Sequence, residues 1–400
     1  MVKRIPQKRR HSIVLFSCVL NLCAVKYFYR VLFDRVRQVA KRIANIRVDK
    51  QSIEGSCFPL FVTIQSHEKE TRRIAARKFT SGGSKNMENN GLQQLKENIA
   101  KVMIGNERTI ELVLTCLVAK GHILLEDVPG TGKTVMAKSL AKSVEAEFGR
   151  IQFTPDLLPS DVTGLNYFDA KSGEFVFSKG PAFCNILLAD EINRATPKTQ
   201  SSLLECMAER QITVDGVTRP LEEPFLVIAT QNPLETLGTF PLPEAQMDRF
   251  LMKLSMEALS PAEEIQMIAR FLTEEPLAEL SSVCQKEEIR ALQEACKEVY
   301  LHPELVQYLV RIVQETRVNS KIASGVSPRG TLAFLRAVQG HALVQGRNYV
   351  VPEDFKTVAV PVLAHRLTMQ IGADDGRAAE SVIEEILNRI DLPTENWSGR

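Results

Sequence analysis

The stretch from Leu124 to Thr134, read LLEDVPGTGKT, contains the residue types and spacing best suited to binding phosphate. An apolar run ends in a loop of small residues, and an alanine-rich helical pattern follows over 135–144, which is the order of a phosphate-binding loop. Glycines let backbone N–H groups close around phosphate oxygens, and the helix N-terminus adds partial positive charge. In such a loop Lys133 reaches the β- and γ-phosphates, and the Thr134 hydroxyl holds Mg²⁺.

The loop departs from the usual pattern at one position, because Asp127 stands where the first glycine is expected, six residues before the lysine. The pattern is therefore met only from Pro129 onward, and a glycine-rich turn with a chance lysine is the alternative interpretation. The residues predicted to bind the nucleotide phosphates are Asp127, Val128, Pro129, Gly130, Thr131, Gly132, Lys133 and Thr134.

A second candidate site ends the run from Asn185 to Glu191, read NILLADE. Its consecutive apolar residues predict a fully buried parallel strand, and ligands bind at the carboxyl ends of such strands in open α/β sheets. Asp190 suits coordination of Mg²⁺ through waters, and Glu191 suits polarisation of an attacking water. Two helix-capping carboxylates are the alternative, but their position 57 residues after Lys133 on a buried strand favours the site.

Three further polar residues could complete a site for phosphoryl transfer. Asn232 follows the apolar run 225–229 and could hydrogen-bond both a γ-phosphate and the lytic water, although Asn before Pro233 is also a common turn residue. Arg249 lies near the end of a short predicted helix, where it either forms a surface ion pair or supplies transition-state charge in trans. Arg329 opens a later helix and could point back at a nucleotide held between two domains.

These residues need a sheet and helices to position them, and the hydrophobic pattern predicts both. It indicates one or two helices within 92–118, a helix over 199–209, a strand over 150–154 and hairpins over 165–177 and 211–221. After Ser260 it indicates helices only, over 262–272, 286–298, 303–316, 328–345 and 352–367. We therefore predict an α/β domain with a parallel sheet over 87–259, an all-α lid over 260–392 and a tail over 393–400.

The charge of the chain is unevenly distributed, although its net charge is only +2. Residues 1–86 contain 19 Lys and Arg against 5 Asp and Glu, whereas residues 87–400 contain 31 against 43. An acidic main body argues against binding of nucleic acid as the principal activity, because affinity for phosphate backbones needs clustered cations.

Cysteine and histidine usage predicts neither disulfides nor a structural metal. The eight cysteines form no CxxC pair and no zinc spacing with histidine, which is typical of a reducing compartment and leads us to expect a cytoplasmic protein. The histidines are scattered, and we interpret four of them as helix-surface or interface residues rather than ligands, namely His122, His302, His341 and His365.

Residues 1–86 differ from the rest of the chain in their basic character and lack of sustained periodicity. The apolar run from Ile13 to Val25 is shorter than the ~20 residues of a membrane span, and a weak signal anchor over 13–33 is one interpretation. The interpretation we favour is a non-native or disordered upstream extension. Met87 opens a sensible amphipathic helix, and Gly82–Gly83 could be encoded by a ribosome-binding sequence.

Taken together, the chain resembles the MoxR family of AAA+ ATPases from about Met87 to Leu392. The strings that carry the resemblance are LLEDVPGTGKT, FTPDLLPSDVTG, GPAF followed by NILLADEINRA, IATQNP, FPLPEAQMDRF and SPRG. The resemblance implies Walker A at Lys133 and Thr134, Walker B at Asp190 and Glu191, sensor 1 at Asn232, the arginine finger at Arg249 and sensor 2 at Arg329. It also implies that the hairpins over 165–177 and 211–221 are the helix-2 insert and the pre-sensor-1 hairpin. Residues 1–86 have no counterpart in it.

The resemblance further implies a homo-oligomeric ring, expected to be a hexamer, that hydrolyses ATP with Mg²⁺ at its subunit interfaces. There Arg249 of a neighbour would stabilise the transferring phosphoryl group. Such proteins act as chaperone-like remodelers in the maturation of protein complexes or in metal-cofactor insertion, often with von Willebrand factor A domain partners. The alternatives are a magnesium-chelatase-like or nucleic-acid-directed motor and a nucleotide-dependent scaffold without turnover. No helix-turn-helix extension or zinc module supports the nucleic-acid motor, and retention of Glu191 counts against the scaffold.

Overall fold

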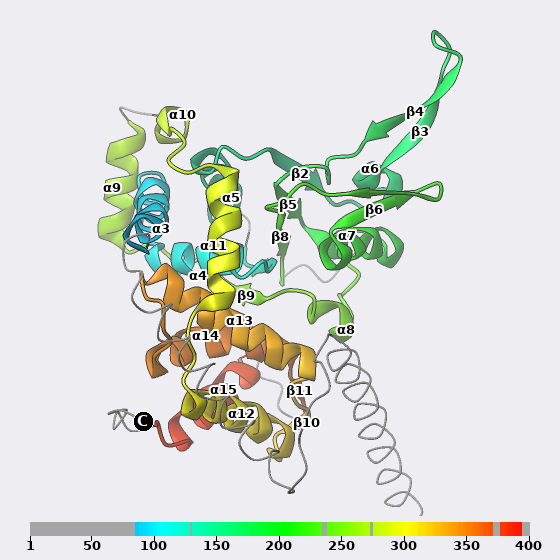
Figure 1. Cartoon of the computed structure of the whole chain (residues 1–400). Helices are drawn as coiled ribbons and strands as arrows, with labels where there is room; N and C mark the ends of the chain where they lie inside the picture. The colour runs from blue at the N-terminus through cyan, green and yellow to red at the C-terminus, as the bar shows by residue number, and fades with distance from the viewer. Residues whose placement is uncertain (1–84, 129, 234–237, 273–274, 371–376, 394–400) are drawn as a thin grey trace, which may run out of the picture. The chain divides into compact units, whose positions relative to one another are not determined.

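A five-stranded parallel sheet in the order β2–β5–β8–β1–β9 forms the centre of the α/β part of the chain (Figure 1). Its strands are β1 (Ile123–Glu126), β2 (Phe148–Gln152), β5 (Ile186–Asp190), β8 (Leu226–Gln231) and β9 (Met252–Leu254). The computed structural model describes residues 85–400 apart from 129, 234–237, 273–274, 371–376 and 394–400. The predicted parallel sheet is confirmed, and our interpretation of residues 1–86 lies almost wholly outside the described residues.

The central strands β1, β5 and β8 are apolar up to their polar carboxyl ends because helices cover both faces of the sheet, and successive side chains point to opposite faces. In β5, Ile186 and Leu188 join one hydrophobic cluster, whereas Leu187 and Ala189 join the other. The first cluster includes residues of α3 (Lys85–Ala100), α4 (Glu107–Val118) and α5 (Lys133–Ser143). The second includes residues of α6 (Pro159–Thr163) and α7 (Pro197–Glu209). The edge strand β9 escaped prediction because three residues are too few for a periodic signal.

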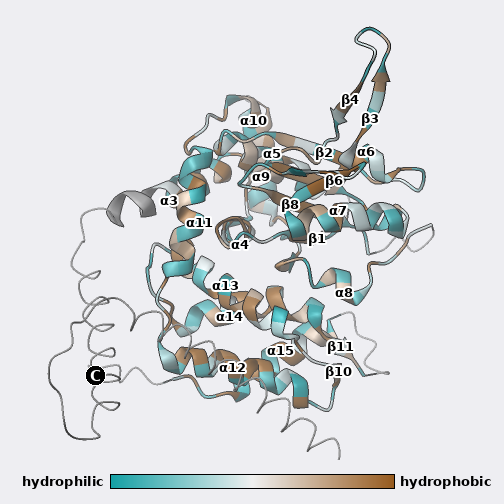
Figure 2. Cartoon of the chain, turned by 45° about the vertical axis from the view of Figure 1, so that its right-hand side comes forward, coloured by the Kyte–Doolittle hydropathy of each residue, from teal (hydrophilic) through white to brown (hydrophobic). Residues whose placement is uncertain are grey.

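Both predicted hairpins are present, and they contact each other (Figure 2). One pairs β3 (Gly164–Asp169) with β4 (Glu174–Lys179), and the other pairs β6 (Gln211–Val214) with β7 (Val217–Pro220). The guanidinium carbon of Arg219 lies 3.8 Å from the centroid of the Phe177 ring, and Asn166 Nδ2 donates a 2.6 Å hydrogen bond to Asp215 Oδ2. These contacts join the second hairpin to the base of the first.

The C-terminal part is mainly helical, as predicted, with one correction. Its helices are α9 (Pro261–Phe271), α10 (Pro276–Glu279), α11 (Lys286–Glu298), α12 (Pro303–Val318), α13 (Pro328–Val344), α14 (Pro352–Leu363), η2 (Ala364–Arg366) and α15 (Ala378–Arg389). The expectation of helices only was wrong, because β10 (Ile322–Ser324) pairs with β11 (Thr368–Met369). These strands are too short for a periodic pattern. The helix predicted to reach residue 367 ends at Leu363, where the chain continues as the short 3₁₀ helix η2.

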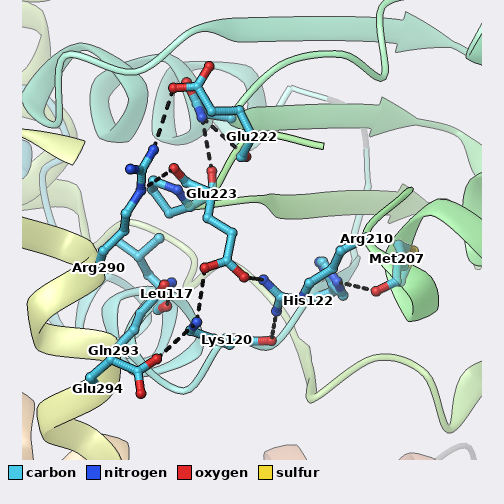
Figure 3. Close-up of polar contacts among 12 residues, drawn as sticks. Leu117, Lys120, His122, Met207, Arg210, Glu222, Glu223, Arg290, Gln293 and Glu294 are labelled. Carbon is cyan, nitrogen blue, oxygen red and sulfur yellow. Dashed lines mark hydrogen bonds and ion pairs between the residues drawn. The ribbon is translucent and has the colours of Figure 1, made fainter. Parts of the chain in front are cut away.

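A charged network ties the base of the β6–β7 hairpin to α11 (Figure 3). Lys120 Nζ lies 3.0 Å from Glu223 Oε2 and 3.2 Å from Glu294 Oε1, and Arg210 Nη1 lies 3.4 Å from Glu223 Oε1. Arg290 Nε donates a 2.6 Å hydrogen bond to the backbone oxygen of Glu223. Because Lys120 precedes β1 and Glu223 precedes β8, the network lies at the amino edge of the sheet.

The described cysteines, at positions 116, 184, 206, 284 and 296, are all free and buried, and burial raises the pKa of each thiol. Our interpretation of the histidines needs correction, because His122 and His341 are buried and hydrogen-bonded rather than on helix surfaces. His341 lies at helical spacing between Val338 and Val344 on the apolar face of its helix, so the helical pattern could have indicated its burial. Among the described residues, we find no helix with the length and apolar character that crossing a membrane requires.

Candidate active site

The turn between β1 and α5 has the backbone conformation that phosphate binding requires. Gly130 and Gly132 have φ angles of 89° and 90°, in the left-handed region that glycine adopts without strain. α5 begins at Lys133, and the first N–H groups of a helix have no partner within that helix, so they can bind an anion. Lys133 Nζ donates a 3.0 Å hydrogen bond to the Asp127 carbonyl oxygen at the start of the loop. Pro129 lies outside the described residues.

Asp127, the residue that departs from the usual motif, connects the loop to the segment after β9. Its Oδ1 accepts a 2.8 Å hydrogen bond from the Val128 N–H, and its Oδ2 accepts one of 3.2 Å from the Met256 N–H. A glycine could make neither contact. Compared with glycine, Asp127 therefore restricts the backbone at the start of the loop and fixes it to the segment after β9.

The two candidate carboxylates lie at the carboxyl end of β5 and share one hydroxyl on β8. Thr230 Oγ1 donates a 2.6 Å hydrogen bond to Asp190 Oδ1 and accepts a 2.9 Å hydrogen bond from the Glu191 N–H. Glu191 has a φ of 56°, a left-handed conformation that is uncommon for a non-glycine residue. The Thr230 hydroxyl thus fixes both the Asp190 carboxylate and the turn that directs Glu191. The sequence predicted the end of this strand, but not that Thr230 neighbours Asp190.

Strand β2 and the turn after β5 add three partners that sequence reasoning missed. Arg150 Nη2 lies 2.8 Å from Asp190 Oδ2, and Gln152 Nε2 donates a 2.6 Å hydrogen bond to Glu191 Oε2. Arg194, in η1 (Ile192–Arg194), places its Nε 3.1 Å from the same Glu191 oxygen. Only the strand order β2–β5 brings the first two residues to the carboxylates, and no local motif marks them.

Asn232 is the first residue after β8 and is buried, and its backbone oxygen accepts a 3.5 Å hydrogen bond from Asn193 Nδ2. Because parallel strands end at one edge, the sheet brings together the phosphate loop, Asp190, Glu191 and Asn232. The described residues contain no cluster of three or more His, Cys, Asp or Glu arranged to hold a metal. The oxygens of Thr134 and Asp190 instead suit a cation that takes few protein ligands and completes its shell with phosphates and water, as Mg²⁺ does.

The two predicted arginines lie apart from this edge. Arg249 follows α8 (Glu244–Met247) and is half-buried, and its Nη1 donates a 2.5 Å hydrogen bond to the Leu204 carbonyl oxygen on α7. Arg329 lies in the first turn of α13 and is exposed. The arrangement at the carboxyl edge can bind a polyphosphate and orient a water, and Arg150 and Arg194 already contact its carboxylates, but neither predicted arginine lies there.

Comparison with known proteins supports this description. Residues 122–252 match the model of the ATPase family associated with various cellular activities (AAA), and residues 314–386 match the AAA lid domain. The chain is 48% identical over 305 residues to the uncharacterized protein YeaC of Bacillus subtilis, covering 76% of this chain and 95% of that protein. It is 42% identical over 308 residues to Chaperone MoxR1 of Mycobacterium tuberculosis, covering 74% and 81% respectively. A crystal structure of a candidate ATPase from Cytophaga hutchinsonii has a TM-score of 0.74 at 37% identity, covering 79% of this chain and 99% of that one.

Proposed function

Because this chain belongs to the MoxR family of AAA+ ATPases, we propose that it hydrolyses ATP, with Mg²⁺, at the interfaces between subunits of a ring, which we expect to be a hexamer. That the protein is an ATPase follows from its family. The proposal concerns which subunit supplies each part of the site.

The position of Arg249 is the observation that carries the proposal. Strand β9 runs parallel to β1, and the Leu251 N–H donates a 2.8 Å hydrogen bond to the His122 carbonyl oxygen, so Arg249 belongs to the amino edge of the sheet. The phosphate loop follows β1 at the carboxyl edge. Five steps along the extended chain, from His122 to Asp127, separate the two edges by about 16 Å, which is more than an arginine side chain reaches. Arg249 therefore suits the site of a neighbouring subunit better than its own.

Arg329 lies near the same edge of the sheet as Arg249. Ser327, which caps the helix that Arg329 opens, donates a 3.3 Å hydrogen bond from its Oγ to Asp248 Oδ2. Asp248 is the residue before Arg249, so the start of α13 adjoins the same amino edge. We therefore infer that Arg329 also acts in trans, on the nucleotide to which Arg249 is presented.

Within the subunit that binds ATP, the carboxyl-edge residues hold and orient the reactants. Lys133 and the loop N–H groups bind the phosphates, and Thr134 and Asp190 would hold Mg²⁺, which when bound neutralises phosphate charge. Glu191 accepts a proton from the attacking water, and Asn232 orients that water toward the γ-phosphate. The arginines of the neighbour then stabilise the charge that develops on the transferring group.

In our proposal this cycle drives chaperone-like remodelling of protein complexes, including insertion of metal cofactors, together with a von Willebrand factor A domain partner. Support comes from the β3–β4 hairpin, where Phe168 and Phe175 are 57% and 75% exposed, which suits contact with a protein client. The free thiols agree with a cytoplasmic location. A magnesium-chelatase-like or nucleic-acid-directed motor would use the same cycle on another client.

The test is ATP hydrolysis by the full chain as a function of protein concentration, with ring assembly followed by light scattering. The rate per subunit should rise with the same midpoint as assembly. Glu191→Gln should assemble and bind ATP but hydrolyse it at least about 100-fold more slowly. Full activity of the monomer would contradict an interfacial site. ATP binding without hydrolysis at any concentration would favour the scaffold.

A further inference from the structure

Arg366, in η2, has a side chain that is only 2% exposed and hydrogen-bonds mainly to the segment carrying Arg249, with further contacts to the Val362 carbonyl oxygen and to His365 Nε2. Its Nε donates a 2.7 Å hydrogen bond to Asp248 Oδ1. Its terminal nitrogens donate to the carbonyl oxygens of Phe250 at 2.5 Å and Leu251 at 3.1 Å. A buried guanidinium is costly unless its donors are used, and here one guanidinium binds residues on both sides of Arg249, namely Asp248 before it and Phe250 and Leu251 after it.

The same side chain also packs under the first turn of α13. A Cβ built on Gly330 would lie 2.9 Å from Arg366 Cδ, so the helix rests directly on the arginine stem. Ser327 donates to the Asp248 carboxylate from the other side. Burial lowers the pKa of Arg366, Asp248 raises it and the nearby charge of Arg329 lowers it further. Arg366 therefore lies between the segments that carry Arg249 and Arg329.

We propose that Arg366 is a positioning residue that holds Arg249 and Arg329 in one fixed relation, so that both reach the nucleotide of the neighbouring subunit together. This inference rests on the interfacial site proposed above. Arg366 is itself too buried to touch a nucleotide. Its effect on hydrolysis must therefore pass through the two arginines, and it belongs to the subunit that donates them rather than the one that binds ATP.

A lysine cannot replace this arginine, because one ammonium group cannot span the Asp248 carboxylate and the two carbonyl oxygens as a planar fork does. Arg366→Lys keeps the charge and most of the buried stem, so the fold should survive. Instead, Arg366→Lys should displace Arg249 and Arg329 and so lower the rate of ATP hydrolysis. Misplacement of a catalytic group by about 1 Å can lower a rate by up to 100-fold.

Mixed rings of full-length chains can assign the effect to one subunit. Lys133→Ala removes ATP binding but leaves Arg249 in place, and Arg249→Ala leaves the ATP site in place. Neither variant alone should hydrolyse ATP, and an equal mixture should regain activity at the interfaces that combine them. Adding Arg366→Lys to the Lys133→Ala chain should lower the regained kcat about tenfold or more. Adding it to the Arg249→Ala chain should leave kcat unchanged.

A matched control is Arg347→Lys in the Lys133→Ala chain. Arg347 also forms a close guanidinium–carboxylate pair, with Nη1 2.8 Å from Asp354 Oδ2, but this pair lies within the lid. The control mixture should keep its activity. Three results would each overturn the role of Arg366. They are a lower kcat only when Arg366→Lys is added to the Arg249→Ala chain, an equally lower kcat whichever chain carries it, and an unchanged kcat with either chain. If the mixture of Lys133→Ala and Arg249→Ala chains regains no activity, the proposal of an interfacial site is wrong, and the inference about Arg366 fails with it.

Discussion

The side-chain amide of Gln152 donates a 2.6 Å hydrogen bond to Glu191 Oε2 from the neighbouring strand, and Arg194 lies 3.1 Å from the same oxygen. The carboxylate proposed to activate water is thus directed toward β2. We expect Gln152→Ala to raise steady-state ATP hydrolysis about fivefold, because losing a hydrogen bond worth about 1 kcal/mol frees Glu191 to turn toward the nucleotide.

The control for this change is Gln93→Ala, which removes a 2.8 Å amide–carboxylate hydrogen bond to Glu97 on the surface of α3. Its rate should match that of the unmodified protein. A lower rate for Gln152→Ala would mean that Gln152 holds Glu191 in its productive orientation.

Restoring the usual glycine at position 127 should weaken the site rather than improve it. Asp127→Gly removes the acceptors of the Val128 and Met256 N–H groups, so the loop loses its attachment to the chain after β9. We expect the Kd for ATP, measured by titration calorimetry, to rise about tenfold, which corresponds to about 1.4 kcal/mol. Asp127→Asn keeps an acceptor oxygen and should bind ATP more tightly than Asp127→Gly. If the unmodified protein, Asp127→Gly and Asp127→Asn all bind ATP with equal affinity, the hydrogen bonds of Asp127 do not support ATP binding.

Thr230→Val should damage the site while preserving the shape of the side chain. It removes the hydroxyl that donates to Asp190 and accepts from the Glu191 N–H, which leaves a half-buried N–H without this partner. We expect a loss of about 1–3 kcal/mol in the free energy of unfolding, measured with urea, together with a lower kcat. The matched change Thr218→Val, at an exposed hairpin position, should alter neither quantity. Unchanged stability of Thr230→Val would contradict this account.

The buried His122 should make stability depend on pH. Its Nδ1 accepts from the Val227 N–H while its Nε2 donates to the Met207 carbonyl oxygen, so only the neutral ring fits. Burial, reinforced by the charge of Arg210, lowers the pKa of His122 to about 3. Because this value lies below the pKa of histidine in the unfolded chain, the contribution of His122 to the free energy of unfolding is complete above pH ~6.5. That contribution is lost as the pH falls toward 3.

Between pH 7 and pH 5 this single group should cost about 2 kcal/mol of stability. His122→Gln keeps one donor and one acceptor but cannot titrate, so its urea unfolding free energy should fall by about 2 kcal/mol less over that interval. Equal losses in the two proteins would show that His122 does not titrate on unfolding in this range.

The sequence by itself determined the features that are encoded in contiguous residues. The phosphate loop, the buried strand ending at Asp190 and the hairpin turning at Asp215–Gly216 each depend on local backbone conformation, and a short run of residue types is enough to specify that. The assembly of Lys133, Asp190 and Asn232 at one edge also followed, because parallel strands end together.

Only the tertiary structure decided which residues support these groups. Gln152 and Glu191 are 39 positions apart, and Asp248 and Arg366 are 118 apart. Such pairs depend on strand order and on the packing of the lid, and they leave no periodic or motif signal in the chain. The location of Arg249 at the amino edge depends on the three-residue strand β9, whose pairing with β1 is decided by long-range hydrogen bonds rather than by local propensity.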